Sequence, residues 1–280
     1  MRVFVISLAQ SIDRRQRAAE QLARLNVSFE FYDAVGADGA VEEHFGRYDE
    51  QAFLHHTGRN MQPGEAGCYA SHLQLWHQCV ALQQAIVVME DDFELDAAFP
   101  KALQAIAGVI GQVGYIRFQT ETRARKTFVR TIGDFTLWRY TKAPHSAMCY
   151  AITPQVAAVL IEHSQVLDAP VDVQVKKFWE HEQPLYGLTP YTVKESELAA
   201  STVIGERKKA RKSLYVRLQR GNSRVRDCWR RVKFNAGLSK AVRLPTCALP
   251  LAINGTELAA NLEVQTIVDI QGQLHDSAIT

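Results

Sequence analysis

The sequence has no hydrophobic stretch long enough to cross a membrane. The chain has 280 residues, 47% of them hydrophobic, and its long uncharged stretches include 102–116 and 144–161. These fall short of the roughly 20 apolar residues that a bilayer requires. The apolar run at the N-terminus is also shorter than a secretory signal, so residues 3–8 are predicted to form a buried strand. These absences argue against an integral membrane protein.

Cysteine is scarce as well. The five cysteines are odd in number and widely spaced, with no C-x-x-C pair and no Cys/His cluster at zinc spacing. A chain of this size folds without disulfides, so the thiols are expected in the core or on the surface in a reducing compartment. Internal repeats and low-complexity tracts are absent too. The expected location is the cytoplasm.

Positive charge is missing from the end of the chain and concentrated just before it. Residues 206–243 carry 14 Lys and Arg against two acidic residues, a net charge of +12, which leaves −10 on the rest. The last 37 residues contain no Lys or Arg. We therefore divide the chain into a catalytic-sized body at 1–205, a basic segment at 206–243 and a low-charge tail at 244–280. For the tail, disorder is an open alternative.

Strands alternate with helices along the body. The predicted strands are 3–8, 27–32, 85–89, 115–118 and 148–152, with a hairpin of 127–132 and 135–140 around Gly133-Asp134; the predicted helices are 13–26, 97–110, 171–182 and those starting at Pro63 and Thr153-Pro154. Residues 34–63 are expected to form a long surface loop. This order predicts an α/β fold in which ligands bind at the carboxyl ends of the strands.

Three consecutive acids, Glu90, Asp91 and Asp92, follow the apolar strand at 85–89. Like charges so close together repel one another, and a hard divalent cation relieves that repulsion. In a strand-end turn Glu90 and Asp92 can converge while Asp91 points elsewhere. The alternative is a solvated loop whose acids cap the helix after Leu95. An aspartate nucleophile is disfavoured, because the D-x-D order of such enzymes is absent.

Four blocks of the sequence share an order with a known family. They are VFVISL (3–8) with DRR (13–15) and FEFYDAV (29–35); GEAGCYASH (64–72) with Trp76; VVMEDD (87–92); and AMCYAITP (147–154) with PVD (170–172), followed more weakly by STVIG (201–205). In these blocks residues 1–205 resemble glycosyltransferase family 25, the lipopolysaccharide-type galactosyltransferases related to collagen galactosyltransferases. Ser7 departs from the family's usual Asn, and Ala66 and Met89 are apolar replacements.

The resemblance implies a GT-A-like fold, that is, a Rossmann-like nucleotide-sugar-binding mixed sheet flanked by helices. It also implies a UDP-sugar donor, most often UDP-galactose, with Mn²⁺ or Mg²⁺ and inversion at the anomeric carbon. Glu90 and Asp92 are the predicted metal ligands. The predicted donor-binding residues are Ser7, Leu8, Arg14, Arg15 and Asp91. The arginines are equally well explained as solvated residues of a first helical turn.

Inversion in one displacement requires a general base. Asp172 is the first candidate, with Glu121 and Glu65 as competitors, although Asp172 is also placed to cap a helix. Ser71 and His72 are expected, with Glu65, to line or support the site. A structural role for His72 in bonding the backbone of a nearby loop is an alternative. The sequence gives His55, His56 and His77 no role.

The basic segment has two interpretations. Residues 207–233 combine Lys and Arg with aromatic and aliphatic residues, which is typical of a helix resting on anionic lipid and fits a glycolipid acceptor. Nucleic-acid binding is disfavoured because no recognised motif is present and the acids would repel polyphosphate. A solvated helix without function is a further alternative.

The sequence therefore predicts a metal-dependent inverting hexosyltransferase at the cytoplasmic face of the inner membrane, acting on lipopolysaccharide, lipooligosaccharide or a related glycan. The competing hypothesis is a non-catalytic nucleic-acid or anionic-surface binding protein.

Overall fold

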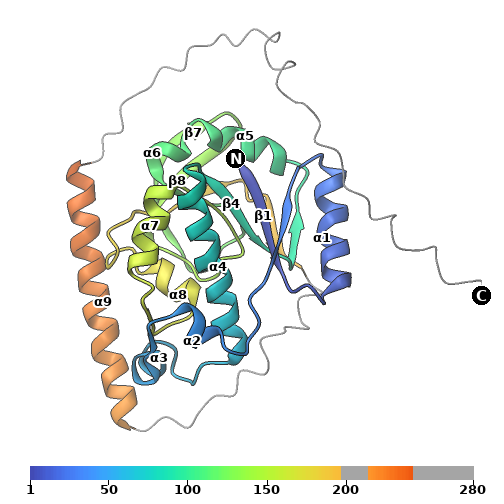
Figure 1. Ribbon diagram of the computed structural model, residues 1–280. Helices are drawn as coiled ribbons and strands as arrows, with labels where there is room; N and C mark the ends of the chain where they lie inside the picture. Colours follow the sequence, from blue (N-terminus) through green and yellow to red (C-terminus); the bar gives the residue numbers. More distant parts are fainter. Residues whose placement is uncertain (197–213, 242–280) are drawn as a thin grey trace, which may run out of the picture. The chain divides into compact units, whose positions relative to one another are not determined.

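The chain opens with a strand–helix–strand unit, as its sequence predicts. The structure, a computed structural model, describes residues 1–196 and 214–241 (Figure 1). β1 (Arg2–Ser7) and β2 (Glu30–Asp33) pair in parallel, and α1 (Ile12–Arg24) connects them. The helix presents Ala18 and Leu22 to the sheet, where both are buried. This apolar stripe at a spacing of four residues is what makes the segment an amphipathic helix.

The rest of the body contains the other predicted strands and helices in their predicted order, together with short elements that the sequence did not predict. They are α2 (Ala40–His44), β3 (Arg47–Tyr48), α3 (Glu50–Thr57), α4 (Pro63–Leu82), β4 (Ile86–Glu90), β5 (Phe93–Leu95), α5 (Phe99–Ala107), α6 (Ile110–Val113), β6 (Tyr115–Arg117), β7 (Arg125–Ile132), β8 (Phe135–Lys142), β9 (Cys149–Ile152), α7 (Pro154–Glu162), β10 (Val166–Leu167), α8 (Val171–Lys176), β11 (Tyr186–Thr189) and β12 (Val193–Glu195). The hairpin of β7 and β8 turns at Gly133, whose φ of +55° suits glycine. The α/β prediction is confirmed.

The main sheet has eight strands in the order β2-β1-β4-β9-β6-β11-β8-β7. β2, β1, β4, β6 and β11 run in one direction, while β9 and β8 run against their neighbours. The carboxyl ends of β1, β4 and β6 therefore meet the amino end of β9 at one edge of the sheet. This is the edge at which ligands bind in open α/β sheets.

Helices cover both faces of this sheet (Figure 1). Successive side chains of a strand point to opposite faces, so Phe4 and Ile6 of β1 pack with α4 and α7. Val3 and Val5 pack on the other face with α1, α5 and α6. Because both faces are buried, the central strands are continuously apolar. The structure is thus a mixed sheet flanked by helices, consistent with the GT-A-like expectation.

Three local expectations are wrong. Residues 34–63 are not a long loop but contain α2, β3 and α3, since Asp49 caps α3 by accepting from Ala52 N at 2.9 Å and Phe53 is fully buried. The acids after β4 do not cap the next helix, because β5 intervenes and pairs with β12. The helix predicted at 171–182 ends at Lys176, where the His181 ring binds Val175 O at 2.8 Å.

A long helix, α9 (Leu214–Ala241), lies within the basic segment. Asn235 binds β8 by accepting from Arg139 Nη1 at 3.1 Å and donating to Thr141 O at 3.0 Å. Phe234 packs against Phe178, with ring centroids 5.5 Å apart. Among the described helices, none combines the length and hydrophobicity of a membrane span. The predicted boundary at 205/206, the block at 201–205 and the tail at 244–280 lie outside the described residues.

Candidate functional site

The acids after β4 lie beside the end of β1 and the start of α1. Ile6 of β1 is in register with Glu90, so Ser7 reaches the next residue and its Oγ donates to Asp91 Oδ2 at 2.5 Å. Arg14 Nη2 lies 2.7 Å from Asp91 Oδ1 and 3.5 Å from Asp92 Oδ2. Asp91 is therefore turned towards Ser7 and Arg14, and it shares the Arg14 guanidinium with Asp92.

Asp92 is a poorly solvated carboxylate. Its side chain is only 16% exposed, and its Oδ1 has no hydrogen-bond partner among the residues that the structure describes. Burial, together with the negative charge of Glu90, raises the pKa of Asp92 to about 7, although Arg14 acts in the opposite direction. A buried oxygen without a partner is costly, so a cation at this position would relieve both the desolvation and the repulsion.

Arg15 holds the ends of the first two strands together. Its guanidinium donates to Ser7 O at 2.8 Å and to Leu8 O at 3.2 Å, and it pairs with Asp33 after β2. Its Cζ also lies 4.9 Å from the centre of the Phe31 ring. These contacts account for Arg15 and for the Leu8 carbonyl as parts of the strand-end architecture, leaving Arg14 as the arginine beside the acids.

A small pocket opens next to this cluster. It is lined by Arg14, Arg17 and Gln21 of α1, by 91–93 and by Ser196. Two guanidinium groups and two carboxylates therefore line the same hollow. Guanidinium groups bind phosphate oxygens well, so the pocket has the chemistry of an anion site next to a cation site.

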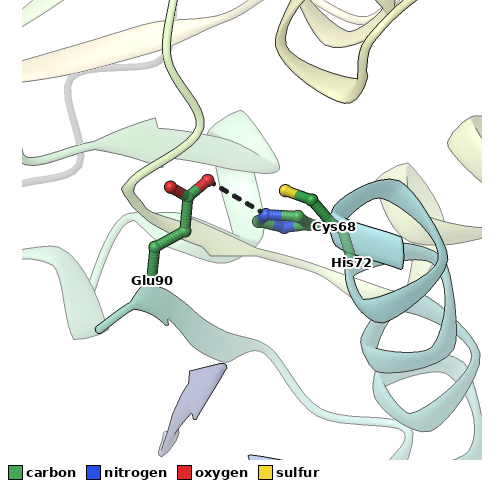
Figure 2. A group of neighbouring side chains, drawn as sticks. All are labelled: Cys68, His72 and Glu90. Carbon is green, nitrogen blue, oxygen red and sulfur yellow. Dashed lines mark hydrogen bonds and ion pairs between the residues drawn. The ribbon is translucent and has the colours of Figure 1, made fainter. Parts of the chain in front are cut away.

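Glu90 points towards His72 of α4 (Figure 2). His72 Nε2 lies 3.3 Å from Glu90 Oε1, and the donor atoms of Cys68, His72 and Glu90 all lie within 4.8 Å of one another. His72 Nδ1 lies 2.8 Å from the Tyr150 hydroxyl, which also accepts from Trp76 Nε1 at 2.8 Å. His72 thus bonds side chains and not the backbone of a loop.

Asp172 lies at the same edge of the sheet. Its Oδ2 is 3.2 Å from His145 Nδ1 and accepts from Ser146 N, also at 3.2 Å, in the loop before β9. Burial alone would raise the pKa of Asp172, but these hydrogen bonds and the charges of His145 and Lys176 outweigh it and lower the pKa to about 2. Ser146 has a φ of +79°, so Asp172 stabilises a backbone conformation that serine seldom adopts. The carboxylate makes no capping bond to α8.

The two competing acids are also held in ion pairs. Arg59 binds both oxygens of Glu65, with Nη1 2.6 Å from Oε2, and Gln62 N donates to the same carboxylate at 3.0 Å. Glu121 accepts from Lys126 Nζ at 2.6 Å. Burial would raise the pKa of Glu121, but its hydrogen bonds with Lys126 and nearby tyrosines lower it overall.

Most of the predicted site residues therefore gather at one place. The charges of Glu90, Asp172, Asp92 and Glu65 all act on the thiol of Cys68, whose pKa is raised first by burial and then by these carboxylates. Glu121 has its described contacts at β7, with Lys126, and lies apart from this group. Ser71 holds α4 to the loop after β2, because its Oγ accepts from Val35 N at 2.9 Å.

Sequence reasoning missed four residues of this arrangement: Arg59, Cys68, His145 and Tyr150. A signal existed for Cys68, since residues four apart on a helix share a face and His72 follows it by four. No local signal marks the partners of the other three. Arg59 lies only six residues before its partner Glu65, whereas His145 and Tyr150 come from segments that only the fold brings to the acids.

Acidic residues at the carboxyl end of a central strand, in a mixed sheet with helices on both faces, are consistent with a GT-A-like glycosyltransferase. The model of glycosyltransferase family 25 (LPS biosynthesis protein) matches residues 1–175, and the chain belongs to this family. The family resemblance of the sequence is thereby confirmed. Family membership supports transferase activity.

Several known proteins are similar over part of the chain. A protein of Haemophilus influenzae named "Putative glycosyltransferase" is 26% identical over 176 residues, which are 61% of this chain and 60% of that protein. The human "Inactive glycosyltransferase 25 family member 3" is 32% identical over 113 residues, and "Procollagen galactosyltransferase 1-B" of Xenopus laevis is 28% identical over 118 residues. Each of these two matches covers 37% of this chain but only 18% of the relative. The chain thus spans about a fifth of the length of its animal relatives.

Proposed function

We propose that the protein is a metal-dependent inverting glycosyltransferase that transfers galactose from UDP-galactose to lipopolysaccharide, lipooligosaccharide or a related glycan. The observation that carries this proposal is the Asp92 carboxylate, which is half-buried next to Glu90 and Asp91 in the chain and keeps one oxygen unpartnered in the described part of the chain. The donor follows the usual donor of the family and the name of the Xenopus relative. The acceptor follows the description of the family.

The Asp92 oxygen that has no partner among the described residues supports a divalent cation at this place. Glu90 and Asp92 offer hard carboxylate oxygens, the preferred ligands of Mn²⁺ and Mg²⁺. Arg14 neutralises part of the charge of Asp91 and Asp92, whereas Glu90 lies beside His72. When bound, the ion supplies Lewis-acid stabilisation of the departing diphosphate.

Arg14 and Arg17 line the pocket beside Asp92 and would bind the diphosphate oxygens. Ser7 orients Asp91, and Asp91 in turn orients Arg14, so this chain of contacts fixes a guanidinium at the pocket. Arg15 contributes indirectly by fixing the ends of β1 and β2.

Asp172 is the proposed general base. It is ionised throughout the neutral range and lies near the other acids, whereas Glu65 and Glu121 are engaged by Arg59 and Lys126. A carboxylate with a pKa of about 2 is a weak base, so the Asp172–His145 contact must loosen for efficient proton removal.

Binding of UDP and Mn²⁺ by the full chain tests the proposal. We expect UDP binding, followed by calorimetry, to depend on Mn²⁺ and to weaken at least tenfold in Asp92→Asn. The matched control is Glu94→Gln, two residues away, whose carboxylate pairs with Lys194 at 3.1 Å outside the site. Metal-independent binding, or an Asp92→Asn protein that behaves like the parent, would refute the proposal.

A panel of UDP-hexoses scored for hydrolysis with Mn²⁺ then tests the identity of the donor sugar. Preference for another hexose would change the proposed donor and leave the rest of the proposal intact.

We also propose that α9 rests on anionic lipid at the cytoplasmic face of the inner membrane. Val225, Trp229 and Val232 are 71%, 69% and 60% exposed, and their spacing of four and three residues places them on one helical face. Phe234 and Asn235 bind the body from a different face of the helix. α9 carries eight Lys and Arg and one acid, which is the charge that complements anionic headgroups.

Sedimentation with vesicles of phosphatidylglycerol and phosphatidylcholine tests this contact. Binding is expected to fall at least fivefold in Trp229→Ser, while Phe128→Ser, which changes a 60% exposed aromatic residue of β7, should bind like the parent. Equal binding of all three proteins would contradict the proposal.

A second function has one observation in its favour: several relatives are named inactive. It is a non-catalytic protein that binds nucleic acid or an anionic surface through its basic segment. Such a protein would bind without turning over UDP-sugars. A salt-dependent shift of nucleic acid in a gel, together with no hydrolysis of any UDP-hexose, would favour it.

A further inference from the structure

Three different metal-binding side chains meet between α4 and β4 (Figure 2). Cys68 and His72 lie one turn apart on α4, and Glu90 ends β4. Their donor atoms lie within 4.8 Å of one another. Tetrahedral zinc with one sulfur, one nitrogen and one oxygen ligand needs donor separations of about 3.3–3.8 Å, given its bond lengths. Donor atoms at the 4.8 Å limit would have to approach one another by about 1 Å when the ion binds.

The surroundings already orient the histidine as metal sites do. Ligating histidines usually bond a second group through the other ring nitrogen, which fixes the ring and its tautomer. Here Nδ1 faces the Tyr150 hydroxyl at 2.8 Å, and Nε2 faces Glu90. Because Trp76 only donates, the Tyr150 oxygen accepts from it and retains one lone pair and one proton for His72. The hydroxyl can therefore serve either tautomer of His72, including the one that leaves Nε2 free for a metal.

The charge and the donor types together define the ion. Glu90 places a carboxylate within 4.8 Å of the Cys68 sulfur and the His72 ring nitrogen, which favours a cation. A thiolate and an imidazole select zinc and other soft or borderline ions over Mn²⁺ and Mg²⁺. We propose that Cys68, His72 and Glu90 form a binding site for Zn²⁺ with one open coordination position. On binding, the Cys68 thiol releases its proton to solvent as the sulfur–zinc bond forms.

The zinc site shares one ligand with the proposed manganese site. Glu90 can serve only one of the two ions fully, so zinc is expected to inhibit manganese-dependent transfer. This consequence rests on the proposed function, whereas the zinc site itself does not. Zinc binding can therefore be measured without nucleotide or manganese.

Cobalt(II) serves as the probe, because a cobalt–thiolate bond gives a charge-transfer absorption that zinc abolishes on displacement. We expect the full chain to develop this absorption and the bands of tetrahedral cobalt, and to lose both when zinc is added. Cys68→Ser should lose the charge-transfer band and bind zinc at least tenfold more weakly in competition with a chromophoric chelator. Cys228→Ser, which changes an exposed free cysteine of α9, is the matched control and should behave like the parent.

Thermal unfolding of Cys68→Ser, and of Cys68→Ala as a second variant, verifies that a lost band does not reflect unfolding. No charge-transfer band in the parent, or a band retained in folded Cys68→Ser or Cys68→Ala, would overturn the zinc site. Asp92→Asn separates the two proposals, since it should keep the cobalt spectrum while losing manganese-dependent UDP binding. A chain that shows the cobalt band but never responds to UDP would refute the proposed function and leave the zinc site intact.

Discussion

At the residue scale, two stacked tyrosines in the core differ in what their hydroxyl groups do. Tyr115 and Tyr150 lie with ring centroids 4.8 Å apart, and both are fully buried. The Tyr150 hydroxyl satisfies Trp76 and His72, whereas that of Tyr115 has no hydrogen-bond partner in residues 1–196 and 214–241. The two rings therefore contribute similarly to packing. The Tyr150 hydroxyl stabilises the fold through its hydrogen bonds, whereas the buried Tyr115 hydroxyl costs free energy because it has no partner there.

Replacing each tyrosine by phenylalanine measures this difference. Tyr150→Phe keeps the ring but strands the buried Trp76 N–H, so we expect a loss of about 1–3 kcal/mol in the free energy of unfolding. Tyr115→Phe removes an unsatisfied hydroxyl and should leave stability unchanged or slightly higher. Urea unfolding of both variants checks the prediction. Equal losses would mean that the Tyr150 hydroxyl is not the support of His72 that the structure indicates.

At the element scale, α4 carries much of the site and depends on one glycine. A Cβ at Gly67 would lie 2.5 Å from Val35 O and 2.8 Å from Gly36 O, and both are backbone atoms that cannot swing aside. This close approach brings the helix against the loop after β2. It thereby sets the position of Cys68 and His72 relative to Glu90.

Gly67→Ala should therefore destabilise the protein by about 1–3 kcal/mol, the usual cost of overpacking. Gly111→Ala in α6 is the control, because nothing lies within 4 Å of its added Cβ. Helix propensity favours alanine there by up to about 1 kcal/mol. Thermal unfolding of both variants measures the two changes in stability. A Gly67→Ala protein as stable as the parent would contradict the tight contact of Gly67 with the loop after β2.

The attachment of α9 depends on a polar contact that can be removed alone. Asn235→Ala loses the bonds to Arg139 and Thr141 O, so we expect faster amide hydrogen exchange in α9 without a change in the main sheet. Lys233→Ala, at an exposed position two residues earlier, should exchange like the parent. If the amides of α9 exchange at the same rate in Asn235→Ala as in Lys233→Ala, Asn235 does not anchor the helix.

At the scale of the whole molecule, one buried histidine makes stability depend on pH. His181 is 2% exposed, and its ring binds Val175 O and Gln183 N. Burial lowers the pKa of His181 from 6.5 to about 4. Between these values the unfolded chain binds a proton that the folded chain excludes. The contribution of His181 to stability is therefore lost as the pH falls from about 6.5 to about 4, while the raised pKa of Asp92 acts in the opposite direction over the same range.

Each unit of pKa difference is worth about 1.36 kcal/mol, so the loss reaches about 3 kcal/mol. His181→Gln keeps a donor and an acceptor without titrating, and its stability should fall less over this pH range. Urea unfolding at pH 7.5 and pH 4.5 measures the difference, with His77→Gln, at an exposed position, as the control. A parent and a His181→Gln protein with the same pH dependence would exclude a buried neutral His181.

The sequence predicts the strands best where burial leaves no choice of residue. β1 and β4 are continuously apolar because helices cover both faces of the sheet, and their ends are marked by Ser7 and Glu90. The short elements between 34 and 63 escape prediction because α3 depends on the Asp49 cap and a single buried Phe53 rather than on a repeated pattern.

The sequence by itself determined the order of the main strands and helices, the acids after β4 and membership of the family, since each of these depends on residues close together in the chain. Only the tertiary structure decided which acids are buried, paired or left without a partner. Asp172 meets His145 across 27 residues, and Glu90 meets His72 across 18. Such contacts depend on how helices pack on the sheet, and no local pattern of residues encodes that packing.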